Sequence, residues 1–348
     1  MWHETNHKLG SYLIQHLPNS LGFDRSRSTA ESPTIPLLSV GIVRVSMSRL
    51  VDASVLVTGG AGFIGSHIAD ALVADNDVTV LDDLSSGKRE NVPEEATFIE
   101  GDVRNATDLA QVGDVDVIFH EAAVVSVAKS VEDPASCHEV TTDGTIRALE
   151  FARRQDARFV VASSAAIYGE PESVPVAEDH PTAPSSPYGI DKLTVDHYTR
   201  LYADLYDLPT VALRYFNVYG PRQTASDYSG VISVFGKQAL AGEPLTVHGD
   251  GSQTRDFVHV DDVVQANLAA ATTDATGEAY NVGTGEETSV LELAETVRGV
   301  ADSDSEIVHE DAREGDIDRS VADISKASEQ LGYEPSVDLA DGLATLVE

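Results

Sequence analysis

The chain has 348 residues, with 23 Lys+Arg against 58 Asp+Glu and a formal net charge of -35. A field this negative repels nucleic acid and anionic membranes, so neither is expected as a partner. No run approaches the roughly 20 apolar residues that cross a bilayer, and the first residues lack the pattern of a secretory signal. The single cysteine, Cys137, excludes an internal disulfide framework and fits a reducing cytoplasm.

The acidic residues are spread through nearly every loop and do not form one tail. Dense carboxylates hold a hydration layer, and salt screens their mutual repulsion. We interpret this composition as that of a halophilic protein from a salt-accumulating cytoplasm. An ordinary acidic enzyme is the alternative interpretation.

Residues 1–46 differ from the rest in charge, with a net charge of +1 that leaves -36 on the remainder. They show no sustained helical or strand period, and Met47 follows just ahead of the first apolar run. We interpret this segment as a non-native or disordered extension, added by an upstream start codon. A solvated N-terminal tail is the alternative.

Short apolar runs then alternate with helical stretches at 64–74 and 145–154. The expected strands contain residues 55–57, 78–81, 117–119, 159–162 and 211–213. Repeated βα units predict an α/β fold, a doubly wound parallel sheet of Rossmann type with helices on both faces. We expect residues 50–220 to be mainly this domain. Residues 221–348, where the spacing becomes irregular, should be mainly a smaller substrate-binding portion interleaved with it.

A glycine-rich segment, GGAGFIG at 59–65, follows the first strand and opens the first helix. Its glycines allow a tight turn and a close approach to a pyrophosphate, which the helix N-terminus then stabilises. Asp82 ends the second strand, where a carboxylate accepts hydrogen bonds from a ribose and repels a 2′-phosphate, so NAD is predicted in place of NADP. Asp102 and Val103 follow a third strand, where adenine would lie. The predicted cofactor contacts are Gly59, Gly62, Phe63, Ile64, Gly65, Asp82, Asp102 and Val103.

Tyr188 and Lys192 stand four residues apart on one face of a helix that Ser186 can cap and Pro187 can begin. A tyrosine is a poor base near neutral pH, but a nearby ammonium and the charge of a nicotinamide lower the pKa of its phenol. Ser164 ends a strand at the carboxyl edge, where open α/β sheets bind ligands. We predict that Tyr188, Lys192 and Ser164 are catalytic, and that Tyr188 and Lys192 also contact the cofactor.

Five segments resemble extended short-chain dehydrogenases/reductases of the NAD-dependent epimerase/dehydratase family, within which the epimerases of UDP-glucose and its relatives match best. They are VTGGAGFIGSH at 57–67, SSAAIYG at 163–169, YGIDK at 188–192, RYFNVYGP at 214–221 and GDGSQTRDF at 249–257. The resemblance runs from about residue 54 to the C-terminus. It implies that bound NAD oxidises C4 of a UDP-sugar, that the 4-keto intermediate turns over, and that the hydride returns to its other face.

The resemblance also implies a substrate site and an assembly. The nucleotide diphosphate would be held by Asn217, Arg255, Arg313 and Asp316. Ser320 would lie beside the C2 substituent of the sugar, where a small residue admits an N-acetyl group. A homodimer would form through the helices around 145–154 and 188–206. Surface ion pairs are the alternative for either arginine.

Other enzymes and a non-enzyme remain as alternatives. Val125 and Thr141 replace a lysine and an asparagine that are common in galactose-type epimerases, which weakens the claim to a particular sugar. The family's 4,6-dehydratases and decarboxylases carry an acid directly after the Ser/Thr, whereas Ala165 and Ala166 stand here. A non-catalytic NAD-binding protein would be expected to have lost Tyr188, Lys192 or Ser164.

No metal is expected, because no H-x-x-H pattern or mixed Cys, His and acid cluster occurs. Three histidines lie in the motif regions, His67, His120 and His259. We interpret them as packed or hydrogen-bonded structural residues.

Overall fold

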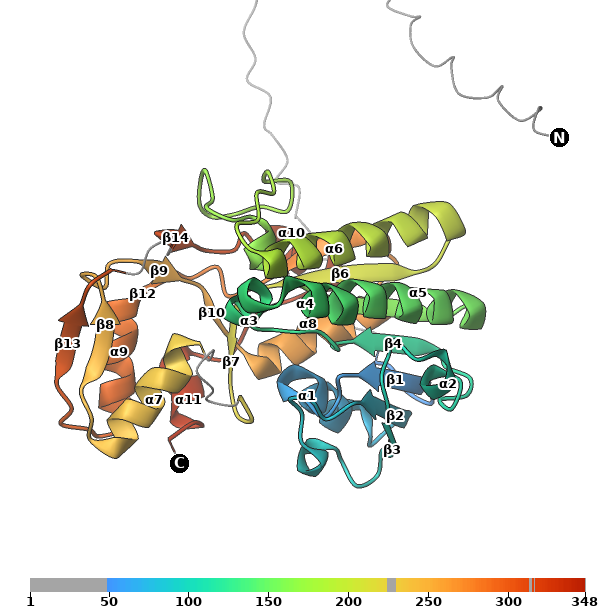
Figure 1. Ribbon diagram of the computed structural model, residues 1–348, viewed down its shortest axis with the longest axis horizontal. Helices are drawn as coiled ribbons and strands as arrows, with labels where there is room; N and C mark the ends of the chain where they lie inside the picture. The colour runs from blue at the N-terminus through green and yellow to red at the C-terminus, as the bar shows by residue number, and fades with distance from the viewer. Residues whose placement is uncertain (1–48, 224–229, 313–314, 316, 348) are drawn as a thin grey trace, which may run out of the picture. The chain divides into compact units, whose positions relative to one another are not determined.

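The computed structural model describes residues 49–223, 230–312, 315 and 317–347. The predicted extension at 1–46, and the predicted ligands Arg313 and Asp316, lie outside these ranges. Seven of the described strands form a parallel sheet in the order β11-β6-β5-β4-β1-β2-β3 (Figure 1). They are β1 (Ser54–Thr58), β2 (Asp77–Asp82), β3 (Thr97–Glu100), β4 (Val117–His120), β5 (Arg158–Ser164), β6 (Thr210–Tyr215) and β11 (Glu278–Val282). The prediction of a Rossmann-type parallel sheet is confirmed.

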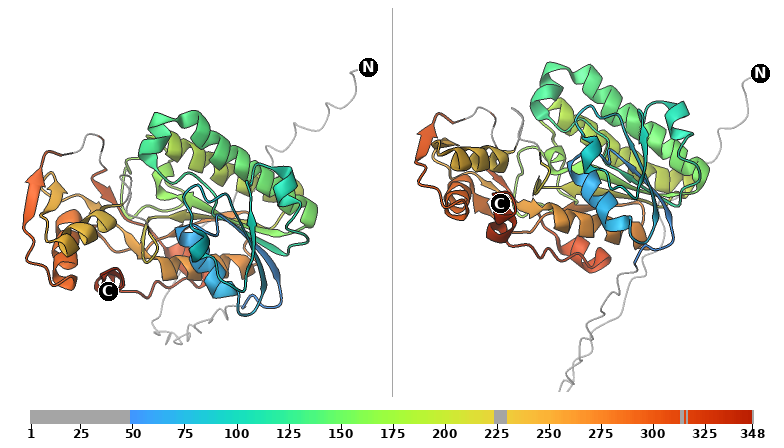
Figure 2. Two further views of the ribbon diagram at one scale, coloured as in Figure 1. Left: turned by 60° about the horizontal axis from the view of Figure 1, so that its bottom comes forward. Right: turned by 90° about the horizontal axis from the view of Figure 1, so that it is seen from below.

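The central strands of this sheet are buried on both faces, which explains why they are apolar runs without alternation. In β1, Val55 and Val57 pack into one hydrophobic cluster, and Leu56 between them packs into another. The first cluster includes residues of α1 (Phe63–Leu72) and α8 (Val260–Thr272), and the second includes residues of α5 (Gly144–Gln155) and α6 (Pro187–Tyr206). Figure 2 shows α5 and α8 on opposite sides of the sheet.

Side chains close in sequence cap the start of α6 and the end of α1. The Ser186 hydroxyl caps α6 by accepting from Gly189 N at 3.1 Å, and Pro187 occupies the first turn, as predicted. Helix α1 ends at Leu72, two residues before the predicted end, where the Asn76 side chain donates to the Leu72 carbonyl at 3.0 Å. This amide satisfies one of the carbonyls that a helix C-terminus leaves unpaired.

A run of short helical segments joins β4 to α5 and packs against α6. It consists of α3 (Val127–Glu132), α4 (Pro134–His138) and a π-helical turn at Glu139–Asp143. Other short segments are α2 (Ala106–Leu109) and the 3₁₀ turns Arg89–Asn91 and Ala165–Ile167. Cys137 of α4 is buried.

The chain beyond β6 builds a second cluster and then returns to the central sheet. Figure 1 places β8, β13, α7 and α9 to the left of that sheet, where they enclose a core that includes Phe235, Leu245 and Leu293. The helices are α7 (Val231–Ala241), α9 (Val290–Val300), α10 (Ser325–Leu331) and α11 (Leu339–Ala344). The strands are β7 (Asn217–Tyr219), β8 (Leu245–His248), β9 (Thr254–Arg255), β10 (Phe257–His259), β12 (Thr288–Ser289), β13 (Ile307–Glu310) and β14 (Arg319–Ser320). Because β11 pairs with β6 and α8 packs on the sheet, part of this C-terminal portion belongs structurally to the first domain.

Among the residues that the structure describes, no helix is both long and apolar enough to cross a membrane.

Candidate active site

The glycine-rich loop between β1 and α1 is packed against the end of β4. Gly59 has a φ of +70°, and a Cβ placed there would lie 2.6 Å from the backbone nitrogen of Ala122. A Cβ on Gly65 would clash with the Gly59 carbonyl. In the described part of the chain, no side chain caps the N-terminus of α1 and its first turn holds no acid. The loop therefore leaves a helix N-terminus available to a phosphate, which fits the pyrophosphate of a dinucleotide.

Asp82, at the end of β2, is tied to this loop. Its carboxylate accepts from Ala61 N at 3.0 Å and from Leu84 N at 2.8 Å. Burial raises the pKa of Asp82, and these two backbone hydrogen bonds oppose the rise. A carboxylate can accept further hydrogen bonds, so this geometry fits a ribose ligand next to the loop.

The third predicted cofactor region contains an ion pair between Asp102 and Arg104. Both carboxylate oxygens of Asp102 accept from Arg104, which the sequence analysis did not consider, with Nε at 3.0 and 2.9 Å. The hydrogen bonds from Arg104 hold the pKa of Asp102 below its usual range. The side chain of Val103 packs in the core under α5.

Ser164 and Tyr188 meet at the carboxyl edge of the sheet. Ser164 is the last residue of β5, and its hydroxyl accepts from Ala166 N at 3.1 Å. The Tyr188 N–H donates to the Ser130 hydroxyl at 3.1 Å. Burial raises the pKa of Tyr188, and the hydrogen bond with Ser164 lowers it. The structure thus brings together two of the three predicted catalytic groups.

Lys192 lies one turn further along α6, with its ammonium over the same edge. Its Nζ donates to the Ala162 carbonyl of β5 at 2.7 Å and lies 6.0 Å from the centre of the Tyr188 ring. The side chain is buried, and burial lowers its pKa against the opposing charges of Glu121 and Asp191. The buried Lys192 side chain therefore lies on the same part of α6 as the Tyr188 ring.

Glu121 is a residue near this site that the sequence analysis missed. It follows β4 directly, and its Oε1 accepts from the Tyr215 hydroxyl at 3.0 Å. Burial raises the pKa of Glu121, and the nearby charge of Lys192 opposes the rise. Glu121 directly follows a buried strand and lies at the same sheet edge as Asp82 and Ser164. This position could have predicted it as a site residue from the sequence.

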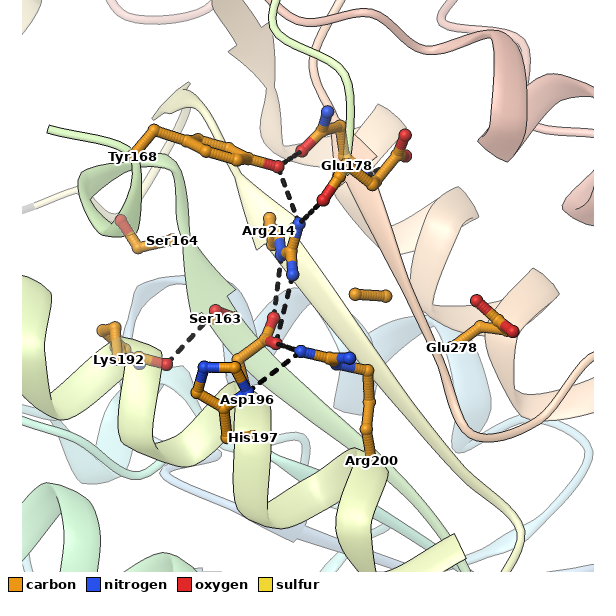
Figure 3. Close-up of polar contacts among 12 residues, drawn as sticks. Ser163, Ser164, Tyr168, Glu178, Lys192, Asp196, His197, Arg200, Arg214 and Glu278 are labelled. Atoms are coloured by element: carbon orange, nitrogen blue, oxygen red, sulfur yellow. Dashed lines mark hydrogen bonds and ion pairs between the residues drawn. The ribbon is translucent and has the colours of Figure 1, made fainter. Parts of the chain in front are cut away.

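A buried charge network, also missed, fixes α6 to the sheet. Figure 3 shows Asp196 between Arg200 and Arg214, with Arg214 reaching on to Tyr168 and Glu178. Arg214 Nε donates to Asp196 at 2.8 Å, and Arg200 Nη2 donates to it at 2.8 Å. Burial alone would raise the pKa of Asp196, but the hydrogen bonds and charge of Arg214, with those of Arg200, hold it below its usual range.

The positions of Asp196 and Arg214 in the sequence could have predicted this ion pair. Asp196 stands four residues after Lys192 on the buried face of α6, and Arg214 lies in the buried strand β6. Two opposite charges on buried faces of adjacent elements indicate a pair, because buried charges are rarely left alone.

A pocket of about 450 Å³ begins where β6 leads into β7. Tyr215 is paired in register with Ser164, and two residues later Asn217 lines the pocket. Arg255 also lines it, and its Nη1 donates to the carbonyls of Thr254 and Ile317. The structure therefore brings together the two predicted diphosphate ligands that it describes.

Ser320 lies next to Arg255 on a neighbouring strand. The two residues are register partners in the parallel pair β9 and β14, so their side chains project from the same face. Ser320 is half-buried. This position is close to the pocket wall that Arg255 forms.

The three histidines of the motif regions all have polar partners within the fold. His120 binds Thr58 and Thr145 through its two ring nitrogens at 2.7 and 3.0 Å, and burial lowers its pKa to about 3. His67 Nε2 lies 3.0 Å from the Pro221 carbonyl, and His259 Nδ1 accepts from Asp261 N at 3.3 Å. Over the described ranges, no three His, Cys, Asp or Glu side chains are grouped to hold a metal ion.

The positions that depart from galactose-type epimerases are also described. Val125 is exposed just before α3. The Thr141 hydroxyl, within the π-helical turn, accepts from Val124 N at 3.2 Å.

A Rossmann-type sheet, a glycine loop at a helix N-terminus and a Ser-Tyr-Lys set at the sheet edge define a dinucleotide-dependent enzyme of the short-chain dehydrogenase/reductase class. The family model for the NAD dependent epimerase/dehydratase family matches residues 55–283. The chain belongs to this family, and its cofactor is NAD.

Three similar proteins illustrate the relationship. The UDP-glucose 4-epimerase of Mycolicibacterium smegmatis is 43% identical over 303 residues, which cover 84% of this chain and 97% of the relative. The UDP-glucose 4-epimerase of Thermotoga maritima, solved with UDP-glucose, is 40% identical with a TM-score of 0.81, covering 84% of this chain and 97% of that one. A UDP-N-acetylglucosamine 4-epimerase from Methanobrevibacter ruminantium, solved with UDP-N-acetylmuramic acid, is 38% identical with a TM-score of 0.82, covering 86% and 98%.

Proposed function

We propose that this chain is an NAD-dependent 4-epimerase of UDP-sugars that interconverts UDP-glucose and UDP-galactose. The observation that carries the proposal is the meeting of Ser164, Tyr188 and Lys192 at one sheet edge. The glycine loop of the cofactor lies on the same edge, because the end of β4 packs on it. This juxtaposition suits the oxidation of an alcohol next to a nicotinamide.

In this mechanism Tyr188 moves the proton. As a phenolate it accepts the proton of the sugar 4-hydroxyl while the C4–H bond breaks with its electron pair, which leaves a ketone at C4. When bound, NAD supplies the acceptor of that hydride and later its donor. After the ketone has turned over, Tyr188 returns the proton to the oxygen as the hydride reaches the opposite face of C4. Lys192 stabilises the phenolate, and Ser164 hydrogen-bonds the reacting oxygen.

The pocket at the end of β6 supports the assignment of a nucleotide sugar. Asn217 and Arg255 line it, and a guanidinium binds phosphate oxygens through two parallel hydrogen bonds. We propose that Arg313 and Asp316, from the segment between β13 and β14, complete the diphosphate site. Asp82 and Asp102 would hold the adenosine half of the cofactor, and the loop glycines would approach its pyrophosphate.

We also propose that the sugar pocket accepts N-acetylhexosamines. Ser320 shares a face with Arg255 and is small, and a small side chain leaves volume for a substituent at C2. The similarity to the Methanobrevibacter UDP-N-acetylglucosamine 4-epimerase supports this extension.

The assembly we propose is a homodimer through α5 and α6. Several apolar side chains of α6 are exposed, among them Leu201 at 44%, Leu205 at 60% and Tyr206 at 47%. An exposed apolar row on one helix favours burial against a second copy. Light scattering of the purified chain should give twice the monomer mass, and a monomer would contradict the assignment.

The setting we propose is a salt-rich cytoplasm. The single cysteine and the charge of -35 support it. At 1 M salt the Debye length is only about 3 Å, so added potassium chloride should raise the melting temperature steeply. Full stability in dilute buffer would contradict the halophilic interpretation.

The test of the activity is a panel of nucleotide sugars incubated with the purified chain without added cofactor. We expect 4-epimers of UDP-glucose and UDP-galactose, with no loss of water or carbon dioxide. A 4-keto-6-deoxy product would favour a dehydratase, although Ala165 and Ala166 offer no acid for that step. Release of carbon dioxide from UDP-glucuronate would favour a decarboxylase. NAD binding without turnover would favour a non-catalytic protein.

A further inference from the structure

Ser130 is a buried serine of α3 whose hydroxyl contacts the backbone of Tyr188. Its side chain is fully buried. The Ser130 hydroxyl donates to the Val127 carbonyl at 2.6 Å within α3. Because this bond uses the only proton of the hydroxyl, the oxygen is left to act as an acceptor. It accepts the Tyr188 N–H at 3.1 Å.

This hydrogen bond completes the first turn of α6. A helix leaves its first N–H groups without partners inside the helix. Pro187 has no N–H, and the Gly189 N–H donates to the Ser186 hydroxyl at 3.1 Å. Tyr188 is the remaining residue of that turn, and Ser130 is the partner of its N–H. The residue that carries the proposed base is therefore held at its backbone by a side chain 58 positions away.

The start of α6 also packs closely on the turn that follows β5. A Cβ on Gly189 would lie 2.8 Å from the Ala166 carbonyl, so the helix backbone lies against the 3₁₀ turn Ala165–Ile167. Ser164 immediately precedes that turn. A shift of the first turn of α6 would therefore change the position of Tyr188 relative to Ser164. These are the two groups that act on the sugar hydroxyl in the proposed mechanism.

The segment that carries Ser130 is tied to α6 at a second point. Asp191 of α6 accepts from the Thr142 hydroxyl at 3.2 Å and pairs with His138 at 2.7 Å. Thr142 and His138 belong to the π-helical turn and to α4, which follow α3. This second contact does not involve Ser130. Removal of the Ser130 hydroxyl should therefore leave the segment folded while it frees the N–H of Tyr188.

We propose that Ser130 is a positioning residue for the reaction, and that it holds the backbone of Tyr188 where the phenol meets the sugar 4-hydroxyl. This inference rests on the proposed function, because it requires Tyr188 to move the proton. Among the described residues, those that line the nucleotide pocket do not include Ser130. Its removal should therefore affect kcat and leave substrate affinity unchanged.

The first test is hydrogen exchange of the Tyr188 amide, which needs no substrate. The chain has 11 tyrosines, so protein with ¹⁵N-labelled tyrosine gives few amide signals, and the Tyr188→Phe variant identifies the one of interest. In Ser130→Ala the N–H loses its acceptor, and its exchange should become about fivefold faster, the effect of one net hydrogen bond. Equal exchange rates in Ser130→Ala and the unmodified chain would overturn the proposal.

The kinetic test compares kcat with KM for UDP-glucose. Ser130→Ala should lower kcat by about tenfold with KM nearly unchanged, which is less than the roughly hundredfold that a misplacement of about 1 Å can cost. Ser130→Thr should recover both kcat and slow amide exchange, because a threonine hydroxyl can also bond to a carbonyl of the preceding turn. If Ser130→Ala does not fold, Ser130→Cys offers a weaker acceptor of similar size and should show a smaller fall in kcat.

The matched control is Ser328→Ala on α10. It removes a half-buried hydroxyl that donates to the Tyr333 carbonyl at 2.9 Å, on a helix that packs against β11 and α8. This variant should keep the full kcat. Equal falls of kcat in Ser130→Ala and Ser328→Ala would show a merely structural role and overturn the proposal.

A double-mutant cycle tests whether Ser130 acts through the phenol of Tyr188. In Tyr188→Phe there is no phenol hydroxyl to place, so adding Ser130→Ala should lower the residual activity no further. The same fold-loss of kcat in both backgrounds would overturn the proposal. A Tyr188 amide that exchanges slowly only when Ser130 is present, in a chain that epimerises no UDP-sugar, would support the positioning contact and overturn the proposed function alone.

Discussion

The sheet edge and the nucleotide pocket hold their functional side chains in different ways. At the edge, Lys192 and Asp196 are buried and contact groups on several elements of the central fold. In the pocket, Arg255 and Ser320 project from strands of two residues and are only half-buried. The groups proposed for proton transfer are therefore supported by the buried core, whereas the groups proposed for substrate recognition lie on short segments. Changes at the edge should therefore affect all substrates, and changes in the pocket should discriminate among them.

The largest effect is expected for Tyr188→Phe. Removing the phenol hydroxyl removes the general acid/base, so activity should fall by about 10²–10⁴-fold for every UDP-sugar, while the fold and NAD binding are kept. Initial rates of epimerisation measure the loss. Tyr198→Phe, on the same helix and partly exposed, is the matched control and should retain full activity. Near-full activity in Tyr188→Phe would refute the mechanism.

Asp196→Asn should break the network that supports the edge. It leaves the buried Arg214 without its countercharge, and breaking a buried pair costs about 3–5 kcal/mol. Denaturant unfolding measures the change in the free energy of unfolding. Asp204→Asn, an exposed position of α6, should change it little. Equal stability of the two variants would show that the Arg214 pair adds nothing.

Asp196 also predicts the sign of an acid response. Its pKa in the folded chain lies below the ordinary value of 3.8. Its contribution to stability is therefore fully present above that ordinary value and is lost as the pH falls through the lower folded value. Between neutral and strongly acidic pH, the free energy of unfolding should decrease more steeply with falling pH in the unmodified chain than in Asp196→Asn. The same slope in both would contradict this assignment.

A smaller and selective effect is expected at Ser320. Ser320→Tyr should overfill the space beside C2 and lower turnover of UDP-N-acetylhexosamines by roughly tenfold to a hundredfold, while UDP-glucose turnover changes little. The ratio of kcat/KM for the two substrates measures this selectivity, and Ser320→Ala should preserve it. Equal losses of turnover on both sugars would show that another residue determines the selectivity for the C2 substituent.

The smallest effect is expected for removal of residues 1–46. A chain that begins at Met47 should match the full chain in melting temperature and activity at equal salt, because the proposed site uses no residue before Gly59. Misfolding or loss of NAD from the shorter chain would make the N-terminal segment part of the working enzyme.

The sequence predicted best those features that depend on residues close together in the chain. The apolar runs and the glycine loop determine the strand, turn and helix around α1, so the central fold was predictable from residues close together in the chain. The Ser186 cap and the spacing of Tyr188 and Lys192 likewise depend on one helix. These features need no knowledge of distant contacts.

The remainder depends on contacts between residues far apart in the chain. Glu121 and Tyr215 are separated by 94 positions, and Arg214 and Tyr168 by 46. Nothing in their local sequence states that these side chains meet, because the sheet order brings their strands together. The sequence indicated that the C-terminal portion is interleaved with the first domain, but it did not indicate that β11 pairs with β6.

The measurement that tests the central claim most directly follows deuterium placed at C4 of UDP-glucose. If the hydride leaves C4, stays within the enzyme and returns to the opposite face, the deuterium will be found at C4 of UDP-galactose after conversion in ordinary water. Loss of the label to solvent, or a product without epimerised C4, would contradict the account.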